Sequence, residues 1–451
     1  MPPFSPDRRS LLQKPVEGLV LRLALPGLAA MLAPALCTLQ EGLLLSRGDP
    51  AASSAAALCY PLLSAQQAVG FTLSMGAGSH VSRALGAGET ASARQAASAA
   101  LALAALLGLA LGAAGLIMLT PLLTALGADA AALPHARPYA AALLLVSPLS
   151  CAGLVLSGLL RAQGKTAENM LACVTASACG AALSARLIAG MGLGTLGAGV
   201  SLAAREALTF ALLAAAVLRA KNGIHPRLRD AAPRAWLFPA IMRSGLPTLL
   251  RQGAASLSGA MISRTAASFG PYALAGMGLA SRAAALVSAA AIGFGQGFSP
   301  VCGVNFGAGK PERSNAAYRF SLRILTGAMV ALGALVFFLS DRLLSLFGAQ
   351  AETAAFAGRV LRAQSAVFFA QGAVTLMTML TQAAGATLRA SLIAVSRQGL
   401  FLIPALWFLP RLLGETGLVL SQSVSDVLAL ALSAPAARGL LTGVDRKRTR
   451  D

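Results

Sequence analysis

The stretch "ALGAGE" at residues Ala84–Glu89 returns as "NFGAGK" at residues Asn305–Lys310, 221 residues later. Two other segments recur at the same spacing. They are "LALPGL" around Pro26 with "RSGLPTL" around Pro247, and "RAQGK" around Gly164 with "QAAGA" around Gly385. Because one accidental match would mean little but three share one spacing, the sequence predicts a duplicated half-protein.

The composition around these repeats indicates a membrane protein. Of the 451 residues, 56% are hydrophobic and 12% are charged, with a mean hydropathy of +0.71. Soluble domains carry roughly 25% charged residues. Apolar runs long enough to cross a bilayer as helices recur along the whole chain. The six cysteines show no CxxC spacing, so we expect neither a metal site nor a disulfide framework.

Turn and charge signals predict an all-α membrane protein with twelve transmembrane helices in two six-helix lobes. The predicted spans are 18–46, 51–77, 92–121, 134–160, 166–190, 194–219, 238–269, 272–301, 314–340, 354–383, 387–410 and 414–440. The predicted organisation is an N-terminal tail (1–17), an N-terminal lobe (18–219), a linker (220–236), a C-terminal lobe (237–441) and a basic tail (442–451).

The net charge of +20 suggests nucleic acid at first, but the distribution of the charge argues otherwise. Basic residues such as Arg83, Arg161 and Arg313 fall in predicted loops on the side of the two termini, and few lie on the other side. This is the positive-inside pattern. We therefore expect no nucleic-acid partner, a bacterial inner (plasma) membrane location and both termini in the cytoplasm.

The even number of spans in each half sets the symmetry of the predicted fold. Both halves enter the membrane from the same side, so their pseudo-two-fold axis lies along the membrane normal. Such parallel repeats place a central cavity between two lobes, and rocking of the lobes exposes that cavity to each side in turn.

Two glycine-rich segments carry a family resemblance. "MGAGSHVSRALGAGETASARQAA" (Met75–Ala97) and "GFGQGFSPVCGVNFGAGKPERS" (Gly293–Ser314) resemble the paired motifs after the second and eighth helices of the multidrug and toxic compound extrusion (MATE) family. "LSGLLRAQGK" (Leu156–Lys165) is similar to the family's fourth-helix ending, and the segment Arg389–Pro410 is similar to its eleventh helix. The likeness covers nearly the whole chain in the expected order.

The resemblance implies a secondary transporter and not an enzyme. It implies cation-coupled antiport of amphipathic organic cations by alternating access, driven by an H⁺ or Na⁺ gradient without a cofactor. We expect small-molecule substrates, membrane lipids as neighbours and a monomeric chain. An alternative is a flippase for lipid-linked intermediates, or an exporter of anionic or zwitterionic substrates that uses an arginine-rich cavity.

A carboxylate interrupts the apolar first span at "ALCTLQEGLLLS" (Ala35–Ser46). Glu41 precedes Arg47 at the outer end of the span by six residues, roughly 9 Å along a helix. A charge at such depth costs a few kcal/mol and is tolerated mainly on ion or proton pathways. The resemblance places the cation or proton site of the N-terminal lobe at Glu41. The alternative is a structural ion pair, for instance with Arg186.

The neighbouring span departs from the family pattern. The family often has an Asn and, four residues later, an Asp in the fifth helix, and these places fall on Gly180 and Ser184 here. The predicted cation or proton site therefore consists of Glu41, Gln40 and Ser184, with two side-chain ligands for Na⁺ missing. Since Arg186 would also repel a metal ion, we expect coupling to protons rather than to Na⁺.

Other polar residues inside the spans are candidates for substrate binding. Glu206 in the sixth span either faces the cavity or pairs with an arginine of a neighbouring span, and Asp426 in the twelfth either binds substrate or makes a helix–helix hydrogen bond. The predicted substrate-binding residues are Glu206, Arg251, Gln252, Gln371 and Asp426.

Overall fold

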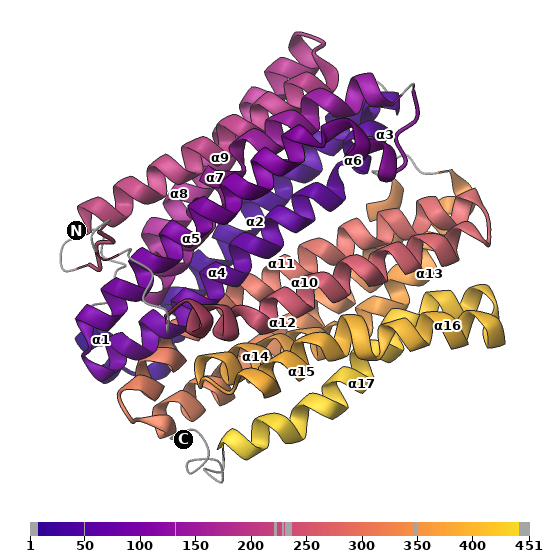
Figure 1. Ribbon diagram of the computed structural model, residues 1–451. Helices are drawn as coiled ribbons and strands as arrows, with labels where there is room; N and C mark the ends of the chain where they lie inside the picture. The colour runs from indigo at the N-terminus through magenta and orange to yellow at the C-terminus, as the bar shows by residue number, and fades with distance from the viewer. Residues whose placement is uncertain are drawn as a thin grey trace.

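The computed structural model describes residues 8–48, 50–130, 132–220, 223–227, 230, 237–345 and 350–441. Within these residues the regular structure is helical throughout. Figure 1 shows two groups of long helices side by side, one coloured indigo to magenta and one orange to yellow. The ends of the chain lie at the same end of the bundle in this view, which we call the terminus-bearing end (Figure 1). The predicted tail 442–451 and most of the linker 220–236 lie outside the described residues.

The first lobe follows a short helix, α1 (Arg8–Gln13), and consists of α2 to α9. Its elements are α2 (Val16–Gly48), α3 (Pro50–Leu58), α4 (Tyr60–Ala87), α5 (Thr90–Ile117), α6 (Leu119–Ala125), α7 (Leu133–Ala162), α8 (Thr166–Ser184), the π-helical turn η1 (Ala185–Gly190) and α9 (Gly194–Arg219).

The second lobe repeats this order with α10 to α17. Its elements are α10 (Leu237–Ala267), α11 (Pro271–Gly307), α12 (Pro311–Ser345), α13 (Ala351–Ser365), α14 (Phe368–Ala383), α15 (Thr387–Val395), the π-helical turn η3 (Ser396–Leu400), α16 (Leu402–Leu413) and α17 (Glu415–Leu441).

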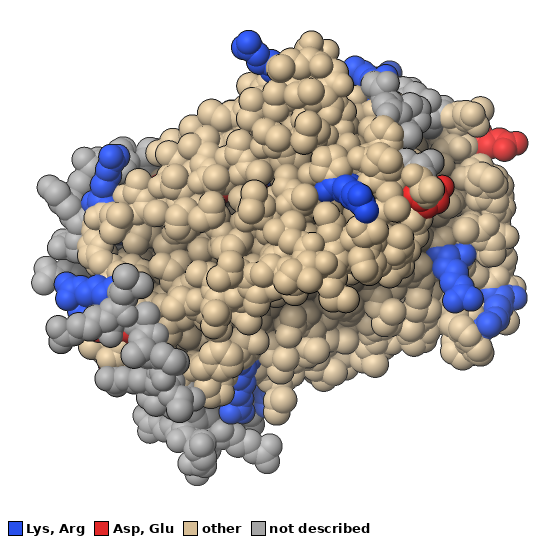
Figure 2. Space-filling model, turned by 45° about the horizontal axis from the view of Figure 1, so that its top comes forward, with Lys and Arg blue, Asp and Glu red and all other residues tan. Residues whose placement is uncertain are grey.

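Most of these helices have the length and composition of membrane spans. Nine described helices are long and apolar enough to cross a membrane, and the pair α13 and α14, bent by 52° at its break, makes a tenth. The long helices outside this set are α4 and α10, which pack against each other between the lobes. Figure 2 shows a broad tan belt with most of the charged side chains of this face toward its two ends.

The predicted end of the second span is too early. The sequence predicts a span over 51–77, but α4 continues to Ala87 after a break at Cys59. The polar residues Ser79 and Arg83 suggested a loop, whereas both contact the second lobe from within the helix. A helix between two lobes tolerates polar residues because they find protein partners there and not lipid.

Each lobe inserts the start of its first helix into the other lobe. Leu19, Val20 and Leu23 of α2 belong to the apolar core of the second lobe. In the same way, Leu237 and Ile241 of α10 belong to the core formed by α4, α5 and α7. The exchange follows from the duplication, because equivalent helices make equivalent crossings.

The two lobes meet along a seam of glycines in the half of the bundle near the terminus-bearing end. A Cβ atom at Gly27 of α2 would lie 2.6 Å from the carbonyl oxygen of Gly293 in α11. A Cβ atom at Gly245 of α10 would lie 2.2 Å from the carbonyl oxygen of Thr72 in α4. Only glycine permits backbones to approach this closely. The seam therefore holds the lobes together at the terminus-bearing end.

Candidate functional site

Glu41 lies on α2 in the half away from the terminus-bearing end, and only 4% of the residue is exposed. The thiol of Cys37, one turn earlier, donates a hydrogen bond to Oε1 of Glu41 at 3.8 Å. The nearest cation is Nη1 of Arg205, 4.0 Å from the same oxygen. This separation is the upper limit for an ion pair, so Glu41 is near the guanidinium without being tightly bound to it.

Arg205 projects from α9 and lies between two carboxylates. Its Nη2 atom is 3.4 Å from Oε1 of Glu206, the next residue on the same helix. Its Nη1 atom also donates a hydrogen bond to the hydroxyl of Thr38 at 3.4 Å. Glu206 accepts a second bond, from the hydroxyl of Ser150 on α7, at 2.9 Å. We call Glu41, Arg205 and Glu206 the buried charge cluster.

The buried charge cluster has an unbalanced charge. With both carboxylates ionised, Glu41 and Glu206 contribute two negative charges and Arg205 one positive charge. A net charge inside a membrane protein is costly unless a partner neutralises it. One proton or one monovalent cation balances the cluster.

A glycine on α8 makes room for the arginine. A Cβ atom at Gly180 would lie 3.0 Å from Cβ and 3.1 Å from Cγ of Arg205. Those distances are tighter than nearly all real Cβ contacts, so the arginine stem occupies the space that a larger side chain would need. The residue that departs from the family pattern is thus the one that allows Arg205 to reach Glu41.

A second ion pair lies inside the other lobe. Its acid occupies the repeat position at which the first lobe has a base. Nε of Arg397, on η3, is 2.7 Å from Oδ1 of Asp426, which is 2% exposed. Gln422 donates to the same oxygen at 2.8 Å, and Arg251 of α10 is close enough to Arg397 to interact with its charge. Asp426 follows Arg205 by 221 residues, so the two occupy the same position of the repeat with opposite charge.

Comparison with known proteins decides the family. The family model described as MatE matches residues 26–186 and 247–408, one segment in each lobe. The chain belongs to the MATE family. The multidrug export protein MepA of Staphylococcus haemolyticus is 23% identical over 380 residues, 84% of each chain.

Solved structures share the fold at low sequence identity. A structure described as the outward-facing conformation of a multidrug resistance MATE family transporter has a TM-score of 0.91 and 22% identity, covering 98% of this chain and 99% of that chain. A transporter from Pyrococcus furiosus has a TM-score of 0.92 and 21% identity, with the same coverage, and its description states a reversed polarity of the binding pocket. These matches confirm the twelve-helix fold with two lobes.

In this MATE chain, the two residues predicted to form the site with Glu41 are Gln40 and Ser184. Both make their hydrogen bonds to a backbone carbonyl. Gln40 donates its amide to the carbonyl oxygen of Ala181 at 3.0 Å. The hydroxyl of Ser184 donates to the same carbonyl at 3.0 Å. Gln40 therefore joins α2 to α8, whereas the Ser184 bond lies within α8. A role for the two residues in holding a cation or proton remains a prediction.

The arginine considered as a partner for Glu41 is not the one found there. Arg186 is exposed on the first lobe, and Arg205 occupies the position next to Glu41. The sequence suggested Arg186 because it lies two residues after the predicted Ser184 site. The signal for Arg205 was the adjacent pair of opposite charges in "AAREALTF" (Ala203–Phe210), which lies in an otherwise apolar span.

The five predicted substrate-binding residues fall into separate places of the fold. Glu206 lies in the buried charge cluster and pairs with Arg205 of its own helix, not with an arginine of a neighbouring span. Gln371 of α14 donates its amide to the hydroxyl of Ser288 on α11. Asp426 pairs with Arg397, while Arg251 and Gln252 are half-buried on α10. Of the five, Glu206 combines a buried charge partner with an accessible side chain, 25% exposed.

Proposed function

We propose that this MATE protein exports amphipathic organic cations in exchange for protons, by alternating access of the two lobes. The observation that carries the proposal is the net negative charge of the buried charge cluster, which one proton neutralises. The names of the relatives, which describe multidrug export, support the direction and the broad substrate class. The energy source is the ion gradient, without a cofactor.

The chemistry of the buried charge cluster favours a proton over Na⁺. A sodium ion needs several oxygen ligands around it, as hard cations do in general. The guanidinium of Arg205 occupies the space beside Glu41 and repels a metal ion. Gly180 supplies no side-chain ligand. A proton needs only one lone pair of the Glu41 carboxylate.

Arg205 provides the link between proton and substrate. When Glu41 holds a proton it is neutral, and the guanidinium is retained by Glu206 alone. When a cationic substrate approaches the partly exposed Glu206, it competes with Arg205 for that carboxylate. Arg205 then shifts toward Glu41 and displaces the proton. Both states are neutral, so substrate and proton exclude each other, which is the requirement for antiport.

The position of the seam indicates which side of the membrane is closed in this conformation. We place the terminus-bearing end in the cytoplasm of a bacterial cell and the protein in the inner membrane, as the positive-inside pattern predicts. The glycine contacts then close the lobes on the cytoplasmic side. Binding of protons from outside to Glu41 would precede opening of this seam to the cytoplasm.

Transport by the purified protein in liposomes tests the proposal. We expect an imposed pH gradient to drive accumulation of ethidium, and a Na⁺ gradient at the same membrane potential to have no effect. Glu41→Gln should lower the pH-driven rate at least about tenfold. The matched control is Glu415→Gln, which removes a carboxylate paired with Arg359 outside the buried charge cluster and should transport normally. Transport driven by Na⁺ alone, or an unchanged rate in Glu41→Gln, would overturn the proposal.

A second candidate function is transport of anionic or zwitterionic substrates, including lipid-linked intermediates. The observation that favours it is the positive charge in the second lobe, where Arg397 pairs with Asp426 and Arg251 lies close enough to interact with the charge of Arg397. A panel of cationic, zwitterionic and anionic substrates in the same liposomes distinguishes the candidates. Uptake of anions that is lost in Arg251→Gln and retained in Glu206→Gln would favour the second function, and uptake of cations with the reverse pattern the first.

A further inference from the structure

A second unbalanced charge is buried at the seam between the lobes. Arg161 was predicted for a cytoplasmic loop, but the structure buries it in the last turn of α7, with 6% of the residue exposed. Its guanidinium donates hydrogen bonds to the hydroxyls of Ser157 and, at 3.3 Å, Ser74. Among the described residues no carboxylate lies within ion-pair distance of it. The C-terminal carbonyls of α7 supply only a partial negative charge.

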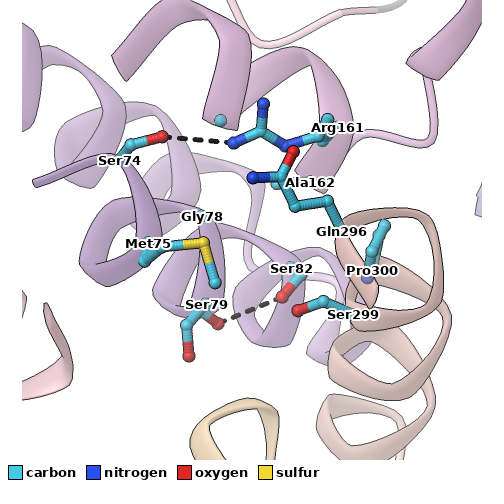
Figure 3. A pocket seen from close by; sticks show the side chains of 11 residues that line it. Ser74, Met75, Gly78, Ser79, Ser82, Arg161, Ala162, Gln296, Ser299 and Pro300 are labelled. Carbon is cyan, nitrogen blue, oxygen red and sulfur yellow. Dashed lines mark hydrogen bonds between the residues drawn. The ribbon is translucent and has the colours of Figure 1, made fainter. Parts of the chain in front are cut away.

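Arg161 borders a small cavity that both lobes line. Figure 3 shows Ser74, Ser79 and Arg161 of the first lobe around it, with Gln296 and Ser299 of α11 from the second lobe. The cavity has a volume of about 20 Å³, which is room for a single small occupant. Neither a substrate molecule nor a lipid headgroup fits such a space.

Gln296 is a buried side chain whose hydrogen-bonding capacity is not fully used. It is 3% exposed, and within the described chain its Oε1 atom has no hydrogen-bond partner. Figure 3 shows its carboxamide beside the Arg161 guanidinium at the cavity. Buried amides are normally satisfied by protein, water or an ion. The atom without a partner is an acceptor, which an anion does not satisfy. The oxygen and nitrogen of a carboxamide exchange places by a rotation of 180°, and this rotation turns the NH₂ group, a donor, toward an occupant of the cavity.

The hydroxyl protons of Ser74 and Ser79, which also line the cavity, are already donated to backbone carbonyls. Ser74 donates to the carbonyl oxygen of Leu154 at 2.7 Å, and Ser79 donates to that of Gln382 at 3.0 Å. The donors left for an occupant are therefore the guanidinium of Arg161, the amide of Gln296 and the hydroxyl of Ser299. Three donors, one of them charged and without a counter-ion, are the chemistry of an anion site.

We propose that this cavity binds one small monovalent anion of the size of chloride. The ion neutralises Arg161 of the first lobe and accepts hydrogen bonds from Gln296 and Ser299 of the second lobe. Because it contacts both lobes at once, it stabilises the conformation in which the seam is closed. Its role is independent of the proton site, which lies in the other half of the bundle.

Binding of radioactive ³⁶Cl⁻ to the purified full-length protein in detergent tests this inference. In a gluconate buffer we expect saturable binding of about one ion per chain, displaced by bromide and not by gluconate. Arg161→Gln and Gln296→Leu should each weaken binding at least about tenfold. Arg186→Gln, which removes an exposed arginine of the same lobe, is the control and should bind as the wild type does.

Thermal unfolding of the wild type keeps the test independent of how well the variants fold. Replacing gluconate with chloride should raise the Tm of the wild type and of Arg186→Gln, but not that of Arg161→Gln. Absence of saturable ³⁶Cl⁻ binding in the wild type would show that the cavity holds only water and would overturn the inference. Undiminished binding in both Arg161→Gln and Gln296→Leu would overturn it as well.

Discussion

At the scale of single residues, the proposed antiport depends on the position of one guanidinium between two carboxylates. Arg205 lies 3.4 Å from Glu206 and 4.0 Å from Glu41, so neither ion pair has the short geometry of a permanent bond. A small shift of the arginine exchanges its partners. In the proposed antiport the arginine therefore acts as a switch between Glu41 and the accessible carboxylate of Glu206, which a tight pair with Glu41 alone would prevent.

Replacing Gly180 tests whether Arg205 needs its present position. In Gly180→Ala the new Cβ meets the arginine stem at 3.0 Å and displaces the guanidinium from its place between the carboxylates. We expect pH-driven transport to fall roughly threefold or more. Gly153→Ala on α7 is the matched control, because its Cβ would find ordinary contacts at 3.7 Å and beyond. Equal rates for the two variants would show that the arginine position is not critical.

Asp426 gives a test that separates a structural role from a substrate role. Asp426→Asn leaves Arg397, whose side chain is 17% exposed, without its counter-charge, which should cost roughly 2 kcal/mol of stability and lower the Tm in detergent. The double variant Asp426→Leu with Arg397→Leu removes both charges and should recover most of that loss. If the double variant is stable and still transports cations, Asp426 has a structural role and does not bind them. If it is stable but does not transport, the predicted substrate role is supported.

At the scale of elements, the proposed transport cycle requires the glycine seam between α2 and α11 to open and close. A Cβ at Gly297 of α11 would lie 2.4 Å from the Cα of Ala24 in α2. The backbones therefore touch, and closure at the terminus-bearing end depends on the absence of side chains at the crossing.

A pair of substitutions on α11 tests the seam. Gly297→Val should force the lobes apart at the terminus-bearing end and increase labelling by a membrane-impermeant maleimide of Ser79→Cys in a cysteine-free background. Gly278→Val is the control, because nothing lies within 4 Å of a Cβ at that position. We expect labelling at least about threefold faster in the Gly297 variant. No difference between the variants would contradict a seam that gates access.

The elements also show how far the sequence alone predicts this fold. Apolar runs and the recurring motifs predicted the twelve spans, because in a membrane hydropathy decides where helices lie. Hydropathy failed at the polar end of α4, where Ser79 and Arg83 bond to the second lobe rather than to water. Arg161 was likewise predicted in a loop, whereas it is buried at the seam and bonds to protein hydroxyls rather than to water. A residue between two lobes resembles a loop residue in sequence, since both are polar.

The whole molecule is a duplicated bundle in which one buried position of the repeat carries opposite charges in the two halves. Arg205 and Asp426 occupy one repeat position, yet the first lobe has an excess of acid around Arg205 and the second an excess of arginine around Asp426. The sequence predicted Glu41 as the site because a buried acid is costly. It could not predict the partner, because side chains from α2 and α9 meet only when the lobe is folded.

At this scale the proposed antiport requires that the buried charge cluster holds either a proton or the charge of a substrate. Proton release on substrate binding measures this directly, with a pH indicator in weakly buffered detergent solution and saturating tetraphenylphosphonium. We predict release of about one proton per wild-type chain, and none from Glu41→Gln, in which binding is confirmed separately. Binding without proton release in the wild type, or equal release from Glu41→Gln, would contradict the account.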